Sequence, residues 1–304
     1  MTSAQTVLGP LDGSVHATAA VPVARRLAEL FHATLAILHV SDETLETAAL
    51  VDRIKLSSQD VRGLVVDQRT GAAAARIVQE AIERHAALIV MCPQTRMDAR
   101  PRTFGSVAKA VLLAARCPVV LVPPTRGRRD WALHQLLLPH DGTPTSAATI
   151  GPATDLALMA AAKLVVLHVA TAGAERPTEP GTLVSPRYID QPQHEWPAWA
   201  DEFLDRLRAV GRATDGVDIR LALAQGEAGS AIVDFAQRND SDLIVLGWRG
   251  VLEHDRAHTM QYVIRESICP VIVFRLDRDD GREPPLWSSS MSDVSAPSSS
   301  TWTG

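Results

Sequence analysis

Short aliphatic runs alternate along this chain with longer stretches in which apolar residues recur at helical spacing. In the first half, the aliphatic runs predict strands at 6–11, 34–40, 62–67, 87–91 and 117–122. The stretches between them predict helices at 14–32, 43–56, 72–85 and 106–115. Within 72–85, one predicted apolar face holds Ala75, Ile77, Val78, Ala81 and Ile82. Uniformly apolar strands that alternate with helices are typical of βαβ units, so the pattern predicts an α/β fold with a parallel sheet.

Segments of the first half recur in the same order in the second half. The matched ranges are 7–14 with 136–143, 35–40 with 164–169, 87–91 with 242–246, and 117–122 with 269–274. The first two pairs share an offset of 129 residues, whereas the third and fourth have offsets of 155 and 152. The chain is therefore predicted to be a duplication. Its second copy has 26 more residues between the second and third strands (155 − 129) and three fewer near its end (155 − 152).

The duplication predicts two domains, which suits a chain of 304 residues. We expect the first domain at 1–123, a Pro/Gly/Arg linker at 124–133 and the second domain at 134–276. The Ser/Pro-rich remainder, 277–304, lacks periodicity and is expected to be disordered. An open apolar edge strand invites aggregation. The copies should therefore pair through their last strands, 117–122 and 269–274, as an intrachain pseudo-dimer, which leaves room for a homodimer of whole chains.

The predicted first helix of each copy contains one proline. Pro22 and Pro152 both fall inside the predicted helical stretch. A proline in a helix interior costs about 3 kcal/mol and kinks the helix. A kink is therefore expected in both first helices.

Composition argues against several classes of partner. The net charge of −5, with no long basic block, opposes binding to duplex nucleic acid. No apolar run reaches the roughly 18–20 residues of a membrane span, and the opening MTSAQTVLGP lacks the features of a signal peptide, so a cytoplasmic location without membrane contact is expected. Cys92, Cys117 and Cys269 are too few and too scattered for a disulfide framework or a metal cluster.

Each first strand leads into an Asp-Gly-Ser/Thr sequence, Asp12-Gly13-Ser14 in the first copy and Asp141-Gly142-Thr143 in the second. Parallel α/β sheets bind ligands at this end of their strands. A carboxylate there is available to a ligand, whereas the alternative interpretation is a helix cap followed by a turn glycine. Recurrence in both copies does not separate the two interpretations.

The succession VLGPLDGS, LHV, LIVM and GSVAKAVLLAARCPVVLV resembles the universal stress protein family, and the duplication resembles its tandem-domain members. The resemblance covers about residues 5–123 and 134–275. It implies two tandem five-stranded parallel-sheet domains, Rossmann-like and similar to adenine-nucleotide α-hydrolases. Many members bind ATP and others bind no nucleotide. In the ATP-binding members, the first-strand aspartate and the end of the second strand hold the adenosine, and a G-x2-G-x9-G-(S/T) loop holds the ribose and phosphates.

The resemblance assigns nucleotide-contacting positions to both copies. They are Asp12, Val40, Gly105 and Ser106 in the first copy, and Asp141, Val169, Gly247 and Gly250 in the second, where the set is expected to be degenerate. The first copy has Cys92 and Thr95 at the early glycine positions but keeps the Gly-Ser that opens a helix. Free backbone N–H groups bind phosphate there, and Arg96, Arg100 and Arg102 lie in the same loop.

The second copy keeps the early glycines but has Ala257 and His258 at the Gly-Ser positions, in a loop three residues shorter. If a nucleotide binds, we therefore expect it in the first copy, with modest affinity. Without its Gly-Ser partner, GWRG (247–250) is expected to be a turn, with Trp248 packed on a neighbouring helix.

The remaining candidates have structural interpretations. His39 and His168 lie in matched LHV strands and are expected to be hydrogen-bonded structural residues, and Cys117 and Cys269 to be small buried ones. A redox role for Cys92 lacks an assigned base or partner. The insertion at about 170–198 contains five prolines, which predict an irregular loop, placed as a lid over the second copy, before a helix at 199–213.

These observations lead to three hypotheses of function. The first is a non-enzymatic universal-stress-type protein that senses or responds to stress, with weak or vestigial ATP binding. The second is an interaction scaffold that binds no nucleotide because side chains fill both pockets. The third, an ATP-using enzyme of a related fold, is opposed by the LDGS loop and by the lack of a glycine-rich phosphate motif.

Overall fold

Both copies fold as α/β units in the computed structural model of this chain, which describes residues 5–57, 61–93, 104–124, 130–170, 180–182, 195–211, 213–248 and 255–276. The strands are β1 (Thr6–Pro10), β2 (Thr34–Ser41), β3 (Val65–Thr70), β4 (Ala86–Met91), β5 (Val119–Leu121), β6 (Gln135–Pro139), β7 (Lys163–Ala170), β8 (Ile219–Gln225), β9 (Leu243–Trp248) and β10 (Val271–Arg275). The helices are η1 (Ala17–Ala19), α1 (Ala20–Leu30), α2 (Thr47–Arg53), α3 (Ala73–Glu83), α4 (Ser106–Ala114), α5 (Pro144–Ala147), α6 (Ile150–Ala160), α7 (Glu195–Gly211), α8 (Ala228–Arg238) and α9 (Asp255–Glu266).

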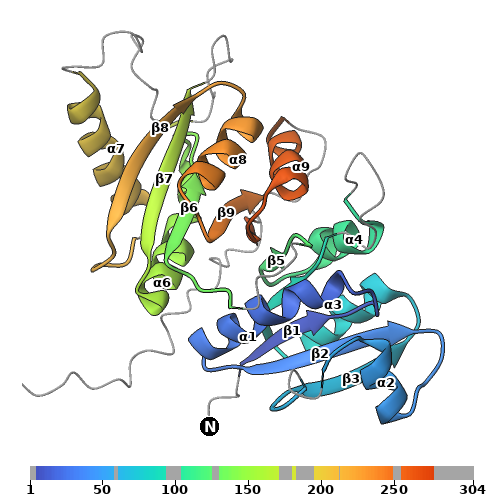
Figure 1. The fold of residues 1–304 in the computed structure, drawn as a ribbon. Coiled ribbons are helices and arrows are strands. Elements are labelled where there is room, and N and C mark those ends of the chain that lie inside the picture. The colour runs from blue at the N-terminus through green and yellow to red at the C-terminus, as the bar shows by residue number, and fades with distance from the viewer. Residues whose placement is uncertain are drawn as a thin grey trace, which may run out of the picture.

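All these strands belong to one sheet, in the order β3-β2-β1-β4-β5-β10-β9-β6-β7-β8. The first five strands in that order come from the first copy and the last five from the second. Within each copy the neighbouring strands are parallel. The predicted α/β fold with a parallel sheet in each copy is therefore confirmed, and Figure 1 shows the two halves side by side.

The two halves join through the last strand of each. β5 and β10 are antiparallel, with Val120 opposite Ile272. These two residues are equivalent positions of the duplication, because they are 152 residues apart. A pseudo-twofold axis therefore passes between them, and the predicted pairing of the last strands is confirmed. Arg275 adds a contact across the joint by donating from Nη1 to Leu113 O at 2.8 Å, at the end of α4.

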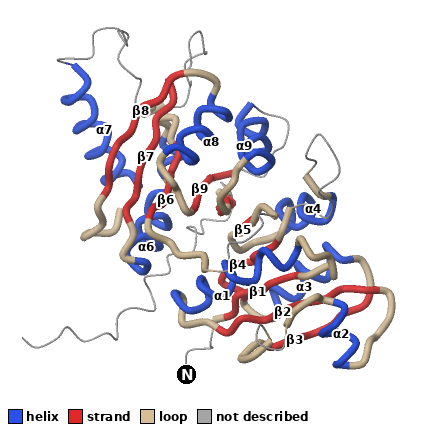
Figure 2. The backbone as a smooth tube through the Cα atoms, in the orientation of Figure 1, coloured by secondary structure: helices blue, strands red, loops and turns tan. Residues whose placement is uncertain are grey.

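Two layers of helices cover the sheet, and each layer extends over both halves (Figure 2). One face packs against α1, α2, α6 and α7, with Leu27 and Phe203 among its buried residues. The other packs against α3, α4, α8 and α9. Because Val120 and Ile272 belong to the first of these cores, the joint between the halves is part of a continuous hydrophobic interior.

The two prolines lie in the first turn of a helix and not in a helix interior, where a proline would cause a kink. The stretch predicted as one helix at 14–32 breaks into a short 3-10 helix, η1, and α1, so that Pro22 is the third residue of α1. The second copy repeats this break, since α5 precedes α6 and Pro152 is the third residue of α6. N–H groups in the first turn have no intrahelical partner, so a proline there removes no helical hydrogen bond.

The third strand and the helix that follows it differ from the predicted pattern. β3 occupies 65–70, not 62–67, because residues 61–63 form a turn in which Gly63 has φ +74°. The helix α3 buries Ile77 and Ala81 but exposes Ala75 and Ile82. Its buried face includes Glu80 instead.

Glu80 is buried because two arginines pair with its carboxylate. Arg69 Nε lies 2.9 Å from Oε2, and Arg84 Nε lies 2.6 Å from Oε1. Arg84 also pairs with Asp67 at 2.6 Å, which joins α3 to β3 through charged groups. A search for apolar periodicity misses this contact, because it counts every charged residue as exposed.

The insertion of the second copy lies largely outside the described residues. Within 170–198, the structure describes residues 170, 180–182 and 195–198. The helix α7 begins at Glu195, earlier than the predicted 199, with Pro197 again as its third residue. Segment 180–182 lies beside α5, since a methyl group on Gly181 would be 3.3 Å from Pro144 Cγ. The role of the insertion as a lid stays a prediction.

Candidate functional site

The loops after the first strands have the same backbone geometry in both copies. Leu11 N donates to Leu38 O and His140 N donates to Leu167 O, each at 2.9 Å. Gly13 and its equivalent Gly142 both have φ +84°. A Cβ on Gly13 would also lie 2.9 Å from Arg53 O, so the first loop requires glycine for its conformation and for space.

In the first copy, the fold brings the four candidate residues to one edge of the sheet. Asp12 follows β1, and Val40 is the penultimate residue of β2. Gly105 is the N-cap of α4, which begins at Ser106, as predicted. Gly105 N donates to Pro93 O at 2.8 Å, which places the start of α4 close to the end of β4. Because β1 lies between β2 and β4, all four residues lie at the carboxyl ends of adjacent strands, where the strand order reverses.

This edge of the first copy presents an open carboxylate and an open helix end. Asp12 is exposed, and its Oδ1 accepts a hydrogen bond from Ser14 N at 2.8 Å. Ser106 is exposed, and the N-cap residue Gly105 has no side chain with which to cap the helix. The outward N–H groups of a helix start attract anions. Cys92 is buried at the end of β4, and the loop residues Thr95, Arg96, Arg100 and Arg102 lie outside the described residues.

In the second copy, the equivalent aspartate is enclosed by its own loop. Asp141 Oδ1 accepts hydrogen bonds from Thr143 N (3.1 Å), Thr143 Oγ1 (2.7 Å) and Ser146 Oγ (2.6 Å). The first copy has Ala17 at the position equivalent to Ser146 and so lacks this hydroxyl. The duplicated motif has therefore become a helix-capping cluster in the second copy.

His140 completes this cluster, although sequence reasoning did not single it out. Its Nδ1 accepts from Gly142 N at 2.9 Å, and its Nε2 lies 3.2 Å from Ser146 Oγ. Its ring contacts Phe203 edge-on, with the centroids 5.4 Å apart. The first copy has Leu11 at this position. In the sequence, the replacement of Leu11 by His140 directly before the repeated Asp-Gly was the one signal of this cluster.

Serine, histidine and aspartate meet here without the geometry of a nucleophilic triad. An imidazole whose Nδ1 accepts a backbone hydrogen bond carries its proton on Nε2 when neutral. His140 is then a donor toward Ser146 and cannot act as its base. In a triad, the acidic residue holds the histidine, whereas here Asp141 accepts from the serine hydroxyl.

Gly247 is a strand residue, so the predicted turn at this position is wrong. It lies within β9 and pairs with Phe274 of β10. A Cβ on Gly247 would lie 2.6 Å from Thr149 Cγ2 and 2.7 Å from Leu276 Cδ1. The glycine therefore admits two side chains that pack against the end of β9. Trp248 is buried in the core beneath α8 and α9, as predicted, and Gly250 lies outside the described residues.

Of the remaining candidates in the second copy, Val169 lies where expected, whereas Ala257 and His258 do not. Val169 is half-buried near the end of β7, as expected from its match to Val40. Their match to Gly105 and Ser106 predicts that Ala257 and His258 open a helix. This prediction is wrong, because α9 begins at Asp255 and both residues lie inside it. Ala257 is buried in the core.

The matched histidines are structural, as predicted. His39 Nδ1 lies 2.8 Å from Leu11 O, and His168 Nδ1 lies 3.0 Å from His140 O. In each copy, the ring N–H donates to the carbonyl that precedes the aspartate. This contact fixes the loop above the second strand.

Protonation of His168 should weaken the folded state. Burial lowers the pKa of His168 below its usual range, although the hydrogen bond to His140 O and the nearby Asp141 carboxylate act in the opposite direction. The unfolded chain therefore binds a proton first as the pH falls below about 6.5. The free energy of unfolding should then decrease, by up to about 1.4 kcal/mol per pH unit, until the folded form also titrates.

Urea denaturation between neutral and mildly acidic pH measures this effect. His168→Asn keeps a donor near the position of Nδ1 but does not titrate. This variant should be less stable at neutral pH and should lose less stability on acidification. An equally steep decline in both proteins would contradict the assignment.

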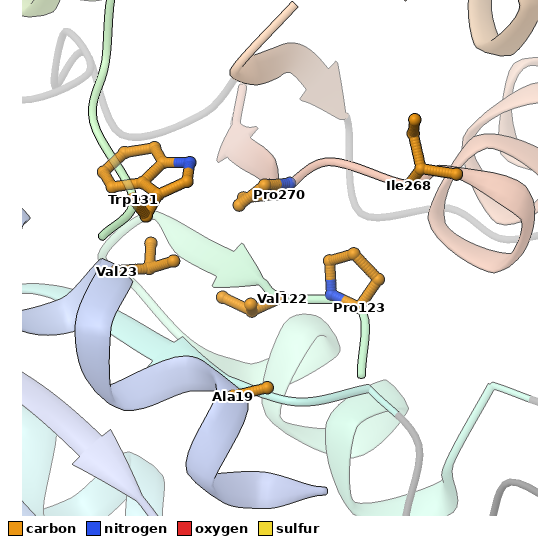
Figure 3. Close-up of a pocket in the computed structure, with 7 residues that line it drawn as sticks. All are labelled: Ala19, Val23, Val122, Pro123, Trp131, Ile268 and Pro270. Carbon is orange, nitrogen blue, oxygen red and sulfur yellow. The ribbon is translucent and has the colours of Figure 1, made fainter. Parts of the chain in front are cut away.

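An apolar hollow lies where the two halves meet (Figure 3). Its lining residues are Ala19, Val23, Val122, Pro123, Trp131, Ile268 and Pro270. Trp131 is fixed there by donating from Nε1 to Asp242 O at 3.2 Å. Because none of these side chains is charged, the hollow does not suit a phosphate. Within the described ranges, there is no cluster of three metal-ligating side chains and no helix suited to span a membrane.

Comparison with known proteins agrees with the geometry of both halves. Residues 43–123 and 133–275 match the Universal stress protein family. The chain belongs to the universal stress protein family. Universal stress protein YxiE of Bacillus subtilis is 27% identical over 155 residues, which cover 47% of this chain and 99% of that protein.

Solved structures share the tandem fold. A putative universal stress protein from Pseudomonas aeruginosa UCBPP-PA14 is 21% identical with a TM-score of 0.62, covering 90% of this chain and 94% of that one. A universal stress protein from Archaeoglobus fulgidus is 15% identical with a TM-score of 0.58, covering 90% and 97%. At these identities the likeness establishes the fold, here two tandem universal stress domains.

Proposed function

We propose that this universal stress protein acts in the stress response without catalysis, and that it binds an adenine nucleotide weakly in its first copy and none in its second. The contrast between the two aspartates carries the proposal. Asp12 is exposed and its carboxylate has capacity to accept further hydrogen bonds, whereas Asp141 Oδ1 receives three donors from its own loop. A ribose hydroxyl therefore finds an available acceptor in the first copy.

The phosphate end of the first copy supports the same assignment. The exposed start of α4 at Ser106 offers backbone N–H groups to an anion. In the second copy, Thr149 and Leu276 pack around Gly247, at the place where the family motif has a ribose and phosphate loop. The tautomer that Gly142 imposes on His140 also supports a role without nucleophilic catalysis.

Calorimetry with ATP on the full chain tests the proposal. Asp12→Asn should weaken ATP binding by about 10- to 100-fold, since hydrogen bonds to charged groups contribute about 1.5–3 kcal/mol. Asp141→Asn is the matched control at the equivalent position and should leave the affinity unchanged.

Two outcomes would contradict the proposal in different ways. A loss of binding in Asp141→Asn alone would place the nucleotide in the second copy. A wild-type chain that binds nothing at millimolar ATP would favour the interaction scaffold.

A further inference from the structure

The side chain of Gln68 ties down the segment that follows β2 in the first copy. Its Oε1 accepts from Leu45 N at 3.0 Å, and its Nε2 donates to Ser41 Oγ at 3.1 Å and to Glu43 O. Ser41 Oγ also donates to Glu43 O at 2.7 Å. One amide thus holds three points of a five-residue turn, 41–45.

This turn begins at the residue next to Val40. Gln68 lies on β3 in register with His39, and Val40 is in register with Arg69. The Gln68 side chain therefore lies beside the last residues of β2, at the edge that also holds Asp12. Whatever contacts the backbone at Val40 also meets the start of the turn that Gln68 fixes.

The second copy lacks this amide. Its His168 is in register with Leu223 of β8, so Leu223 is the counterpart of Gln68. A leucine makes no hydrogen bonds, and this one is 42% exposed. Where the first copy has a short turn held by a glutamine, the second copy has the long insertion. This difference between the copies is independent of the difference between Asp12 and Asp141.

We infer that Gln68 is a positioning residue: by holding the 41–45 turn, it fixes the backbone next to Val40 against which the base of the nucleotide packs. This inference rests on the proposed function. A flat neutral base is recognised by backbone N–H and C=O groups at fixed positions. A turn held before binding reduces the ordering cost of that recognition. Gln68 acts through the 41–45 turn and need not contact the ligand.

The charged groups around the turn indicate which end of the site takes the base and which end takes the phosphates. Asp42, Glu43 and Glu46 are exposed on or next to it, and they repel phosphate groups. The start of α4 at Ser106 attracts anions at the end of β4, on the other side of β1. The base therefore belongs at the Gln68 side and the phosphates at the Ser106 side.

Calorimetry with ATP and with inorganic tripolyphosphate on the full chain tests the role of Gln68. Gln68→Leu, which copies the residue of the second half, should weaken ATP binding by about tenfold, because it removes the hydrogen bonds that hold the turn. Binding of tripolyphosphate should not change, since the phosphate end is separate. The matched control, Leu223→Gln, should leave both affinities unchanged.

Gln68→Met keeps an unbranched side chain of similar length but makes none of the hydrogen bonds of the amide, so a similar loss of ATP affinity is expected. This variant decides the question if Gln68→Leu does not fold. Equal losses of ATP and tripolyphosphate, or no loss of ATP, would overturn the positioning role. If the wild-type chain binds ATP and both Gln68 variants bind it with the same affinity, this inference alone is wrong. If the wild-type chain binds no ATP, the proposed function is wrong as well.

Discussion

Replacing Ile272 with aspartate is expected to lower the free energy of unfolding by more than about 4 kcal/mol. Ile272 is fully buried at the centre of the β5–β10 pair, opposite Val120, in a core of apolar residues. A carboxylate at this position loses its hydration and gains no compensating partner from that core. Because domains are stable by only about 5–15 kcal/mol, the variant should be close to unfolding at room temperature. Urea denaturation followed by circular dichroism measures the loss.

Two further variants make the test specific to the joint. Val120→Asp changes the twofold-equivalent residue, which is also fully buried, and should cause a loss of similar size. Leu223→Asp introduces the same charge on β8, the edge strand, where the leucine is 42% exposed, and should change stability by less than about 1 kcal/mol. If Ile272→Asp were as stable as Leu223→Asp, the halves would not be joined through these strands.

Phe203→Ala is expected to lower the free energy of unfolding by about 3–5 kcal/mol. Phe203 is fully buried on α7, and its ring contacts His140 at 5.4 Å and His168 at 5.8 Å between centroids. Its removal leaves a cavity between the helix, the first-strand loop of the second copy and β7. The same urea denaturation experiment measures this loss.

The neighbouring residue on α7 provides the control. Glu202 is exposed and pairs with Arg206, so Glu202→Ala should cost less than about 1 kcal/mol. Phe203→Leu should lie between wild type and Phe203→Ala, because it fills part of the cavity. A stability of Phe203→Ala within about 1 kcal/mol of wild type would mean that α7 does not support the helix-capping cluster around Asp141.

Much of the fold was predictable because strands and helices repeat at short, fixed intervals along the chain. The duplication, the succession of strands and helices along the chain, and the meeting of β5 with β10 follow from segments of a few apolar residues. The location of Asp12, Val40, Gly105 and Ser106 at one edge also follows, since the carboxyl ends of parallel strands lie together. These inferences need only the order of elements and the ends of the strands.

The details of the site were not predictable in the same way, because they depend on contacts between residues far apart in the sequence. Gly247 was expected in a turn, but its strand geometry serves to admit Thr149 and Leu276. Glu80 was not part of the predicted apolar face of its helix, but Arg69 and Arg84 pair with it in a buried position. Neither glycine nor glutamate reveals such a neighbour by its type.

By itself, the sequence determined two duplicated α/β units. It also predicted a candidate ligand-binding edge in each copy and nucleotide binding in the first copy. Only the tertiary structure decided which aspartate remains open, because the closure of Asp141 depends on how His140, Ser146 and the loop backbone are placed in three dimensions. It also assigned Gln68 to the turn after β2, a contact between residues 23 positions apart. Apolar periodicity is set by local backbone geometry, whereas a hydrogen bond requires two particular atoms to meet, and that meeting is decided by the packing of the whole chain.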